Sequence, residues 1–275
     1  MRFRFVHAAD LHLDTPIEGL AQMCPEATVL LRDGSLQAFD ADSARGALTM
    51  GIDTVIFDMD GVIVDTEQLW NDVRHDFAVA HGGRWTGDDQ PAVMGANSLQ
   101  WAAYMREQCG VDLPNDEIYA GVIRGLRERY ARDLPLIEGA REAIVSLVPR
   151  YRLGLASSSP RELIEYVLEL AGLGESFAAV VSSDEVARGK PEPDVYREAC
   201  ARLEASPRCS VAVEDSSNGI RSAAGAGLAV IAIPNPAFPP SIAALGLADV
   251  VLGSVKQLTI AVVASLRREV PPENR

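Results

Sequence analysis

The chain has 275 residues, of which 48% are hydrophobic and 23% charged, enough for a large globular core and a smaller second domain. Its formal net charge of −14 argues against broad binding to nucleic acids or anionic membranes, because both need a basic surface. No run of residues approaches the ~18 apolar residues of a membrane span. We therefore expect a soluble protein with no nucleic-acid and no membrane partner.

The four cysteines show neither CxxC nor zinc-site spacing, which is typical of free thiols in a reducing compartment. The basic start of the chain could open a signal peptide, but polar residues between His7 and Asp14 interrupt the apolar region that a signal requires. We expect a cytoplasmic protein that is a monomer or a weak dimer.

Residues 1–49 begin with an apolar run that leads to Asp10 and His12. This opening resembles that of the calcineurin-like metallophosphoesterases, in which such an Asp and His start a two-metal site. A two-metal site needs several further ligands, yet the chain has only three other histidines. We interpret residues 1–49 as an incomplete metallophosphoesterase-like fragment that is dispensable for the activity of the rest.

The stretch from Ile52 to Glu67 predicts a buried strand that ends in acidic residues. Its apolar, β-branched run stops at Asp58, Asp60 follows two positions later, and Gly61 marks a sharp turn or a close approach. Two such carboxylates point the same way if the strand continues, and each raises the pKa of the other unless a cation separates them. The stretch therefore predicts a bound metal or a shared proton.

The remaining chain divides into a helical part and an alternating part. Apolar residues recur at helical spacing within 67–133, which predicts three helices and no strand. From 134 to 258, predicted helices alternate with strands, and 259–275 reads as a C-terminal helix and tail. This order predicts an α/β fold: a Rossmann-like, doubly wound parallel sheet with a small all-helical domain inserted after the first core strand.

Polar clusters follow the ends of the predicted strands, and each cluster alone can be explained as a turn or a helix cap. A shared position explains them together, because sites in open α/β sheets lie beyond the carboxyl ends of the strands. The clusters are Asp58 with Asp60, Ser157 with Ser158, Lys190, and Glu214 with Asp215.

The motifs FDMDGVIVDTE, LASSS, GKPEPDVY and VEDSSNG resemble, in order and spacing, the four motifs of the haloacid dehalogenase superfamily of phosphotransferases. The resemblance runs from about residue 51 to 255. It implies an α/β core formed by 50–66 and 134–258, and it identifies 67–133 as a type-one helical cap.

The resemblance implies that Asp58 is a nucleophile that forms an aspartyl-phosphate, and that Asp60 is the general acid and then the general base. Lys190 would neutralise charge, and it is one of only two lysines beside 23 arginines. The implied Mg²⁺ site contains Asp58, Glu214, Asp215 and, through its main-chain carbonyl, Asp60; the implied phosphate site contains Ser157, Ser158 and Lys190.

Several residues distinguish among members of this superfamily. Asp60 favours a phosphate ester, because dehalogenases lack an acid there, and the absence of lysine from 67–133 excludes phosphonoacetaldehyde hydrolase chemistry. β-Phosphoglucomutases have His where this chain has Trp70, and an Arg near where it has Ser98. DTEQLW and LASSSP are more similar to the sugar- and hexitol-phosphate phosphatases, such as 2-deoxyglucose-6-phosphate phosphatase.

We therefore predict a Mg²⁺-dependent phosphomonoester hydrolase for a small sugar or polyol phosphate. The main alternative is a β-phosphoglucomutase-like phosphotransferase; a non-catalytic binding module predicts damaged motifs, and a nuclease predicts more metal ligands in the N-terminal segment. Trp70 fits a substrate contact and a place in the cap core equally well. The residues predicted to choose the substrate at the cap and its hinge are Thr66, Glu67, Trp70 and Gly95.

Overall fold

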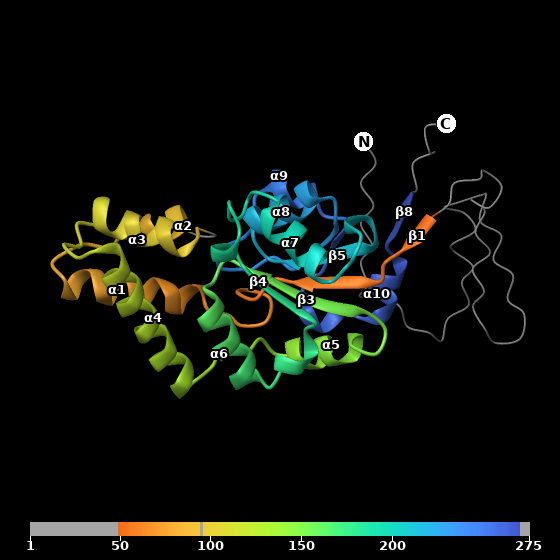
Figure 1. The fold of residues 1–275 in the computed structure, drawn as a ribbon, viewed down its shortest axis with the longest axis horizontal. Coiled ribbons are helices and arrows are strands. Elements are labelled where there is room, and N and C mark those ends of the chain that lie inside the picture. The colour runs from red at the N-terminus through yellow and green to blue at the C-terminus, as the bar shows by residue number, and fades with distance from the viewer. Residues whose placement is uncertain (1–48, 94–95, 270–275) are drawn as a thin grey trace, which may run out of the picture. The chain divides into compact units, whose positions relative to one another are not determined.

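The computed structural model describes residues 49–93 and 96–269 (Figure 1). All but the last residue of the predicted metallophosphoesterase-like fragment, including Asp10 and His12, lies outside the described residues, as does the predicted cap residue Gly95. The elements that carry the site belong to one compact unit.

Six parallel strands form the central sheet in the order β4-β3-β2-β5-β6-β7. The first of these in the chain, β2, lies in the interior of the sheet, with β3 on one side and β5 on the other. The strands are β2 (Thr54–Phe57), β3 (Arg152–Ser157), β4 (Ala179–Ser182), β5 (Ser210–Glu214), β6 (Ala229–Ala232) and β7 (Val250–Val251).

Both faces of the sheet are covered, as a doubly wound fold requires. Along β2, Val55 and Phe57 belong to one apolar cluster and Ile56 to another, because successive side chains of a strand point to opposite faces. The first cluster includes residues of α5 (Ala140–Leu147), α6 (Arg161–Ala171) and α10 (Ile260–Ser265); the second includes residues of α7 (Asp194–Arg202), α8 (Ser217–Ala226) and α9 (Ile242–Leu245).

After β2 the chain forms four helices of the insertion before it reaches α5 and β3 (Figure 1). They are α1 (Glu67–Ala80), α2 (Asp89–Val93), α3 (Ser98–Glu107) and α4 (Asn115–Arg132). Three correspond to the predicted helices, whereas α2 was not predicted, because Pro91 and polar neighbours hide its helical spacing. Pro91 is tolerated because it lies in the first turn, where no intrahelical N–H bond is lost.

The α/β fold with a helical insertion after the first core strand is confirmed. Two short strands were not predicted, β1 (Thr49–Gly51) and β8 (Arg267–Glu269), which form a separate two-stranded sheet. The second of them lies in the segment expected to be helix and tail. Short 3₁₀ helices occupy Gly174–Ser176, Ser183–Glu185, Pro207–Cys209 and Val255–Gln257.

Candidate active site

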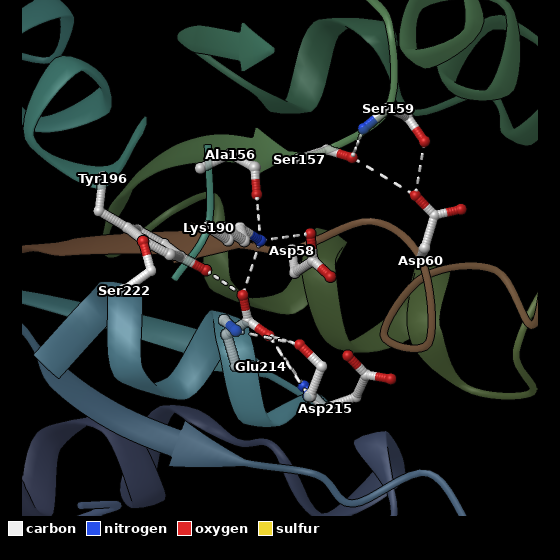
Figure 2. A network of polar contacts seen from close by, with 12 residues as sticks. Asp58, Asp60, Ala156, Ser157, Ser159, Lys190, Tyr196, Glu214, Asp215 and Ser222 are labelled. Carbon is white, nitrogen blue, oxygen red and sulfur yellow. Dashed lines mark hydrogen bonds and ion pairs between the residues drawn. The ribbon is translucent and has the colours of Figure 1, made fainter. Parts of the chain in front are cut away.

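The predicted polar clusters meet at the carboxyl end of the sheet (Figure 2). Asp58 directly follows β2, and its backbone N–H donates to the Val213 carbonyl over 2.9 Å, so the strand pairing with β5 continues to the acid. Ser157 is the last residue of β3 and Glu214 the last of β5, the two strands that flank β2. The parallel register therefore brings residues from three distant motifs to one edge.

Lys190 links these strand ends through its ammonium group (Figure 2). Nζ donates to Asp58 Oδ1 over 2.8 Å, to Glu214 Oε1 over 2.7 Å and to the Ala156 carbonyl over 3.0 Å. Burial acts to lower the pKa of Lys190, but the negative charges of the two carboxylates outweigh it and raise the pKa. Lys190 is therefore a fixed positive charge beside Asp58, the role expected for a compact ammonium.

Glu214 is fully occupied by hydrogen-bond donors. Its Oε1 accepts from Lys190 and from the Tyr196 hydroxyl, over 2.7 Å each, and its Oε2 accepts from the backbone N–H groups of Asp215 and Ser216. A Cβ on Gly219 would lie 1.9 Å from the carboxylate, so the first turn of α8 packs directly against it. This geometry makes Glu214 the anchor of Lys190, in addition to its predicted place near the metal.

Asp58, Glu214 and Asp215 form a buried cluster in which one carboxylate oxygen from each lies within 4.8 Å of the others. Asp215 is held against Gly61, whose φ is +80° and on which a Cβ would lie 1.9 Å from Oδ2. Burial raises the pKa of Asp58 to about 8, although Lys190 opposes the shift, and burial also raises the pKa of Asp215 well above its ordinary value. The single positive charge of Lys190 cannot balance the three negative charges that the cluster carries when all its carboxylates are ionised.

This shortage of positive charge is the test of whether a metal fits. Buried carboxylate oxygens are the ligands that hard divalent cations prefer, and a bound cation would offset the cost of burying their negative charge. The residues therefore fit a divalent metal ion. The carboxylate of Asp60 is directed elsewhere and lies outside the cluster, which leaves its main-chain carbonyl as the predicted metal contact.

Asp60 is surrounded by hydroxyl and indole donors. Its Oδ1 accepts from the Thr66 hydroxyl and from Trp70 Nε1 at 3.4 Å, and its Oδ2 accepts from the hydroxyls of Ser159 at 2.8 Å and Ser157 at 3.4 Å. The hinge residue Thr66 and the first turn of α1 thus contact the same carboxylate as the β3 loop. Two predicted cap residues are placed beside the predicted acid–base group.

The three serines after β3 have different surroundings. Ser157 is fully buried and its hydroxyl also accepts the backbone N–H of Ser159 over 3.0 Å, whereas Ser158 is partly exposed and lines the cavity described below. Ser159, which touches Asp60, was not predicted as a site residue. Its signal was present in the LASSS motif, but the motif could not tell which of three serines would face the acid.

A cavity of about 500 Å³ opens between these strand ends and the helical insertion. Asp58, Asp60, Lys190 and Asp215 line it from the sheet side. The lining residues from the insertion are Glu67, Trp70, Arg74, Gln90, Pro91, Val93, Ala96 and Trp101. Of these, Glu67 and Trp70 were predicted, and Thr66 contacts Asp60 without lining the cavity.

Arg74, Gln90 and Trp101 were missed. Arg74 had a signal, since it lies one helical turn after Trp70 on the buried face of α1, where an apolar residue is expected. Gln90 and Trp101 reach the cavity through α2 and α3, whose placement depends on contacts distant in the sequence. Their part in the cavity follows only from the folded arrangement.

The insertion also touches the sheet domain away from the cavity. Ser98, at the start of α3, donates its backbone N–H to Asp184 Oδ1 over 2.9 Å and its hydroxyl to Oδ2 over 2.5 Å. Tyr119 of α4 donates to Glu162 of α6 over 2.7 Å. These contacts hold the two walls of the cavity together.

Comparison with known proteins identifies the family. The family model of the haloacid dehalogenase-like hydrolases matches residues 52–227, a range that includes all four motifs. The chain belongs to the haloacid dehalogenase-like hydrolases. Hexitol phosphatase B of Escherichia coli (strain K12) is 32% identical over 215 residues, which cover 74% of this chain and 93% of that protein.

Other relatives span a range of activities. A bifunctional riboflavin kinase/FMN phosphatase of Arabidopsis thaliana is 32% identical over 190 residues, but this match covers only 48% of its length. CbbY from Rhodobacter sphaeroides, solved with phosphate, aligns with a TM-score of 0.70 and 27% identity over 78% of this chain and 100% of that chain. A variant of CbbY was also solved with xylulose-1,5-bisphosphate, with a TM-score of 0.69, 27% identity and coverage of 77% and 99%.

β-Phosphoglucomutase from Clostridium difficile aligns with a TM-score of 0.68, covering 78% of this chain and 96% of that chain. At 19% identity, this likeness shows a shared fold and no more. The family match and the phosphatases among the relatives confirm the prediction of a phosphomonoester-hydrolysing enzyme. In the described part of the chain, no helix combines the length and apolar character needed to cross a bilayer.

Proposed function

We propose that the chain is a Mg²⁺-dependent phosphomonoesterase that hydrolyses a small sugar or polyol phosphate through an aspartyl-phosphate on Asp58. The observation that carries the proposal is the pairing of Asp58 with Lys190 at the floor of a cavity that Asp60 also lines. A nucleophile, a charge-neutralising cation and a proton-transfer group thus face one space large enough for a small ligand.

In the first step, a carboxylate oxygen of Asp58 attacks phosphorus and forms the acyl phosphate, while the bond from phosphorus to the ester oxygen breaks. The leaving oxygen takes a proton from Asp60 and departs as an alcohol. Lys190, already bonded to Asp58 Oδ1, remains next to the negative charge that builds up on the phosphoryl group. Ser157 and Ser158, at the end of β3 and just before α6, are proposed to hold phosphoryl oxygens.

In the second step, water attacks phosphorus, Asp60 takes the proton of that water, and the bond from phosphorus to Asp58 breaks. Inorganic phosphate leaves and both carboxyl groups return to their starting states. The donors around Asp60, from Thr66, Trp70 and Ser159, hold its carboxylate beside the cavity between these proton transfers.

Asp58 and Asp215, with Glu214 beside them and the main-chain carbonyl of Asp60, are proposed to hold Mg²⁺. When bound, the ion supplies positive charge that lets Asp58 approach an anionic ester and polarises the phosphoryl oxygens. The raised pKa values of Asp58 and Asp215 support a cation at this place.

The sugar or polyol part of the proposal rests on the relatives and on the cavity. Hexitol phosphatase B aligns over 93% of its length, and the insertion contributes both polar groups and aromatic faces to the wall opposite Asp58. Mixed polar and aromatic walls suit a molecule with hydroxyl groups and C–H faces. We further propose a cytoplasmic monomer or weak dimer. The buried thiols of Cys109 and Cys200, which form no disulfide, support a reducing compartment.

We propose the following domain limits: a core of 50–66 and 134–258, a cap of 67–133, and a C-terminal helix and tail of 259–275. Residues 1–49 are proposed to be dispensable. A chain that starts at Met50 should retain the full phosphatase activity, and a folded but inactive truncated protein would contradict this assignment.

A β-phosphoglucomutase-like transfer is the second candidate, because the structure of a putative β-phosphoglucomutase from Thermotoga maritima aligns at 27% identity over 78% of this chain. Trp70 donates toward Asp60 at a position where mutases have a histidine, which favours hydrolysis. Hydrolysis of a sugar phosphate releases inorganic phosphate, whereas a mutase interconverts glucose 1-phosphate and 6-phosphate without net release.

The test is a screen of sugar phosphates, polyol phosphates and nucleotides for phosphate release, with Mg²⁺ and with EDTA. We expect release that needs Mg²⁺ and is abolished in Asp58→Asn. Asp53→Asn is the matched control, because Asp53 lies just before the opposite end of β2, on the surface. Full activity of Asp58→Asn, or interconversion without release, would overturn the proposal.

A further inference from the structure

Arg74, on helix α1, is the one buried arginine side chain in the cavity wall among the described residues. Only 5% of it is exposed, and it lies on the face of α1 that also buries Trp70 and Val73. Its Nη1 donates to Gln90 Oε1 over 3.0 Å, while its Nε has no hydrogen-bond partner among the described residues. Burying a guanidinium with an unpaired N–H donor costs free energy of folding unless another group, such as a ligand, supplies an acceptor.

Two indole rings hold the guanidinium in place. Its central carbon lies 4.4 Å from the ring centre of Trp70 and 5.2 Å from that of Trp101. Burial lowers the pKa of Arg74 to about 10, so the group stays charged at neutral pH. Arginine stacked on aromatic faces is well suited to present fixed N–H donors, because stacking leaves the edge of its plane available.

Glu67 carries the opposite charge to Arg74 and lines the same wall of the cavity. Gln90 connects the two groups, since its Nε2 donates to Glu67 Oε2 over 2.9 Å while its Oε1 accepts from Arg74. Among the described contacts, Glu67 and Arg74 are joined only through Gln90 and form no direct ion pair, so each keeps bonding capacity for a ligand. Burial and the nearby Asp60 raise the pKa of Glu67.

The charges on this wall decide which ligand group fits. One positive and one negative side chain, with Asp60 close to Glu67, leave no excess of positive charge for a second anion. A second phosphate drawn to Arg74 would also meet the fields of Glu67 and Asp60. A hydroxyl group meets no such conflict, because it accepts a bond from Arg74 and donates one to Glu67.

We propose that Arg74, Glu67 and Gln90 form a subsite that binds the hydroxyl groups of an uncharged polyol chain, and so select singly phosphorylated esters over bisphosphates. This inference rests on the proposed phosphatase function and assigns the part of the substrate away from the phosphate. The rings of Trp70 and Trp101 provide the adjacent apolar surface for the C–H groups of the same chain.

The test compares kcat/KM for three phosphate esters: a six-carbon polyol monophosphate, the bisphosphate of the same polyol, and p-nitrophenyl phosphate, which has no hydroxyl groups. We expect Arg74→Met to lower the ratio of kcat/KM for the polyol monophosphate to that for p-nitrophenyl phosphate by roughly 10- to 100-fold, the value of one or two hydrogen bonds to a charged group. Arg129→Met is the matched control, because Arg129 is a surface arginine of α4 paired with Asp76.

Glu67→Gln keeps the shape of its side chain and provides a second variant if Arg74→Met fails to fold. It should lower the same ratio and increase the use of the bisphosphate relative to the monophosphate, because a negative charge is removed beside Arg74. Equal losses on all three esters would overturn the subsite, as would a wild-type preference for the bisphosphate that Arg74→Met removes. If wild-type protein hydrolysed none of the esters with Mg²⁺ present, the proposed function itself would fail.

Discussion

The buried carboxylates make the stability of the metal-free protein depend on pH in a direction opposite to that of ordinary salt-bridged acids. The pKa of Asp58 rises from 3.8 in an unfolded chain to about 8 in the folded protein. Between pH 3.8 and about pH 8, Asp58 is therefore protonated in the folded state and ionised in the unfolded state, so the folded state binds one more proton. The free energy of unfolding therefore falls as pH rises, and the contribution of Asp58 is fully present below about pH 4 and lost above about pH 8.

The size of this effect follows from the linkage relation. One extra proton in the folded state changes the free energy of unfolding by about 1.4 kcal/mol per pH unit. From pH 5 to pH 7 the contribution of Asp58 is thus about 3 kcal/mol, which corresponds to a Tm lower by roughly 6–12 °C for a protein of this size. Asp215 adds to the loss in the same direction, because its pKa is also raised.

The assay is thermal unfolding between pH 5 and pH 9, with EDTA and with Mg²⁺. We expect the Tm in EDTA to fall with pH, and the increase in Tm on adding Mg²⁺ to grow with pH, because the ion binds the ionised carboxylates. Asp58→Asn should show a shallower fall, which separates the site from the general repulsion of a chain with a net charge of −14. Equal slopes for the two proteins, or Mg²⁺ stabilisation that does not change with pH, would refute the reasoning.

Three further substitutions test individual parts of the site. Lys190→Met should abolish turnover and destabilise the metal-free protein by about 3–5 kcal/mol, because it leaves two buried carboxylates unpaired; Lys256→Met, at an exposed pair, should have little effect. Gly61→Ala should weaken Mg²⁺ binding in a calorimetric titration, because its Cβ would displace Asp215, whereas Gly82→Ala, at a similar φ of +75° in open space, should not. Asp184→Ala should raise KM more than it lowers kcat, because it removes the contact that joins α3 to the sheet domain.

Each of these three predictions has a result that would contradict it. Full turnover in Lys190→Met would remove the lysine from the mechanism, and equal Mg²⁺ affinities of the two alanine variants would mean that Gly61 is required only for its backbone conformation. An unchanged KM in Asp184→Ala would show that the contact between the insertion and the sheet does not shape the cavity for substrate.

The sequence predicted the sheet and its polar edge well because both have short-range signals. The apolar run before Asp58 matches a fully buried strand, and Ser157 and Glu214 end the strands on either side of it. The order of the motifs also predicted that Lys190 belongs to the site, although its loop is far from β2 in the chain. The strand order itself was not predicted, because it depends on which crossovers pack together and leaves no local pattern.

The parts that were missed depend on long-range packing or on very short elements. The three-residue strands β1 and β8 are too short to show periodicity, and Pro91 masks α2. Arg74 violated the apolar pattern of α1, but only the fold shows that two tryptophans and the cavity surround it. Departures from the expected pattern on a buried helical face are therefore worth weighing as site residues.

The central claim, that Asp58 carries the phosphoryl group during turnover, can be tested by reductive trapping. Borohydride reduces an aspartyl-phosphate to homoserine, so protein mixed with substrate and Mg²⁺ is treated with borohydride and its peptides are analysed by mass spectrometry. We predict homoserine at position 58, dependent on substrate and absent when Asp58→Asn is used. Phosphate release without any modification of Asp58, or trapping at another carboxylate, would contradict the account.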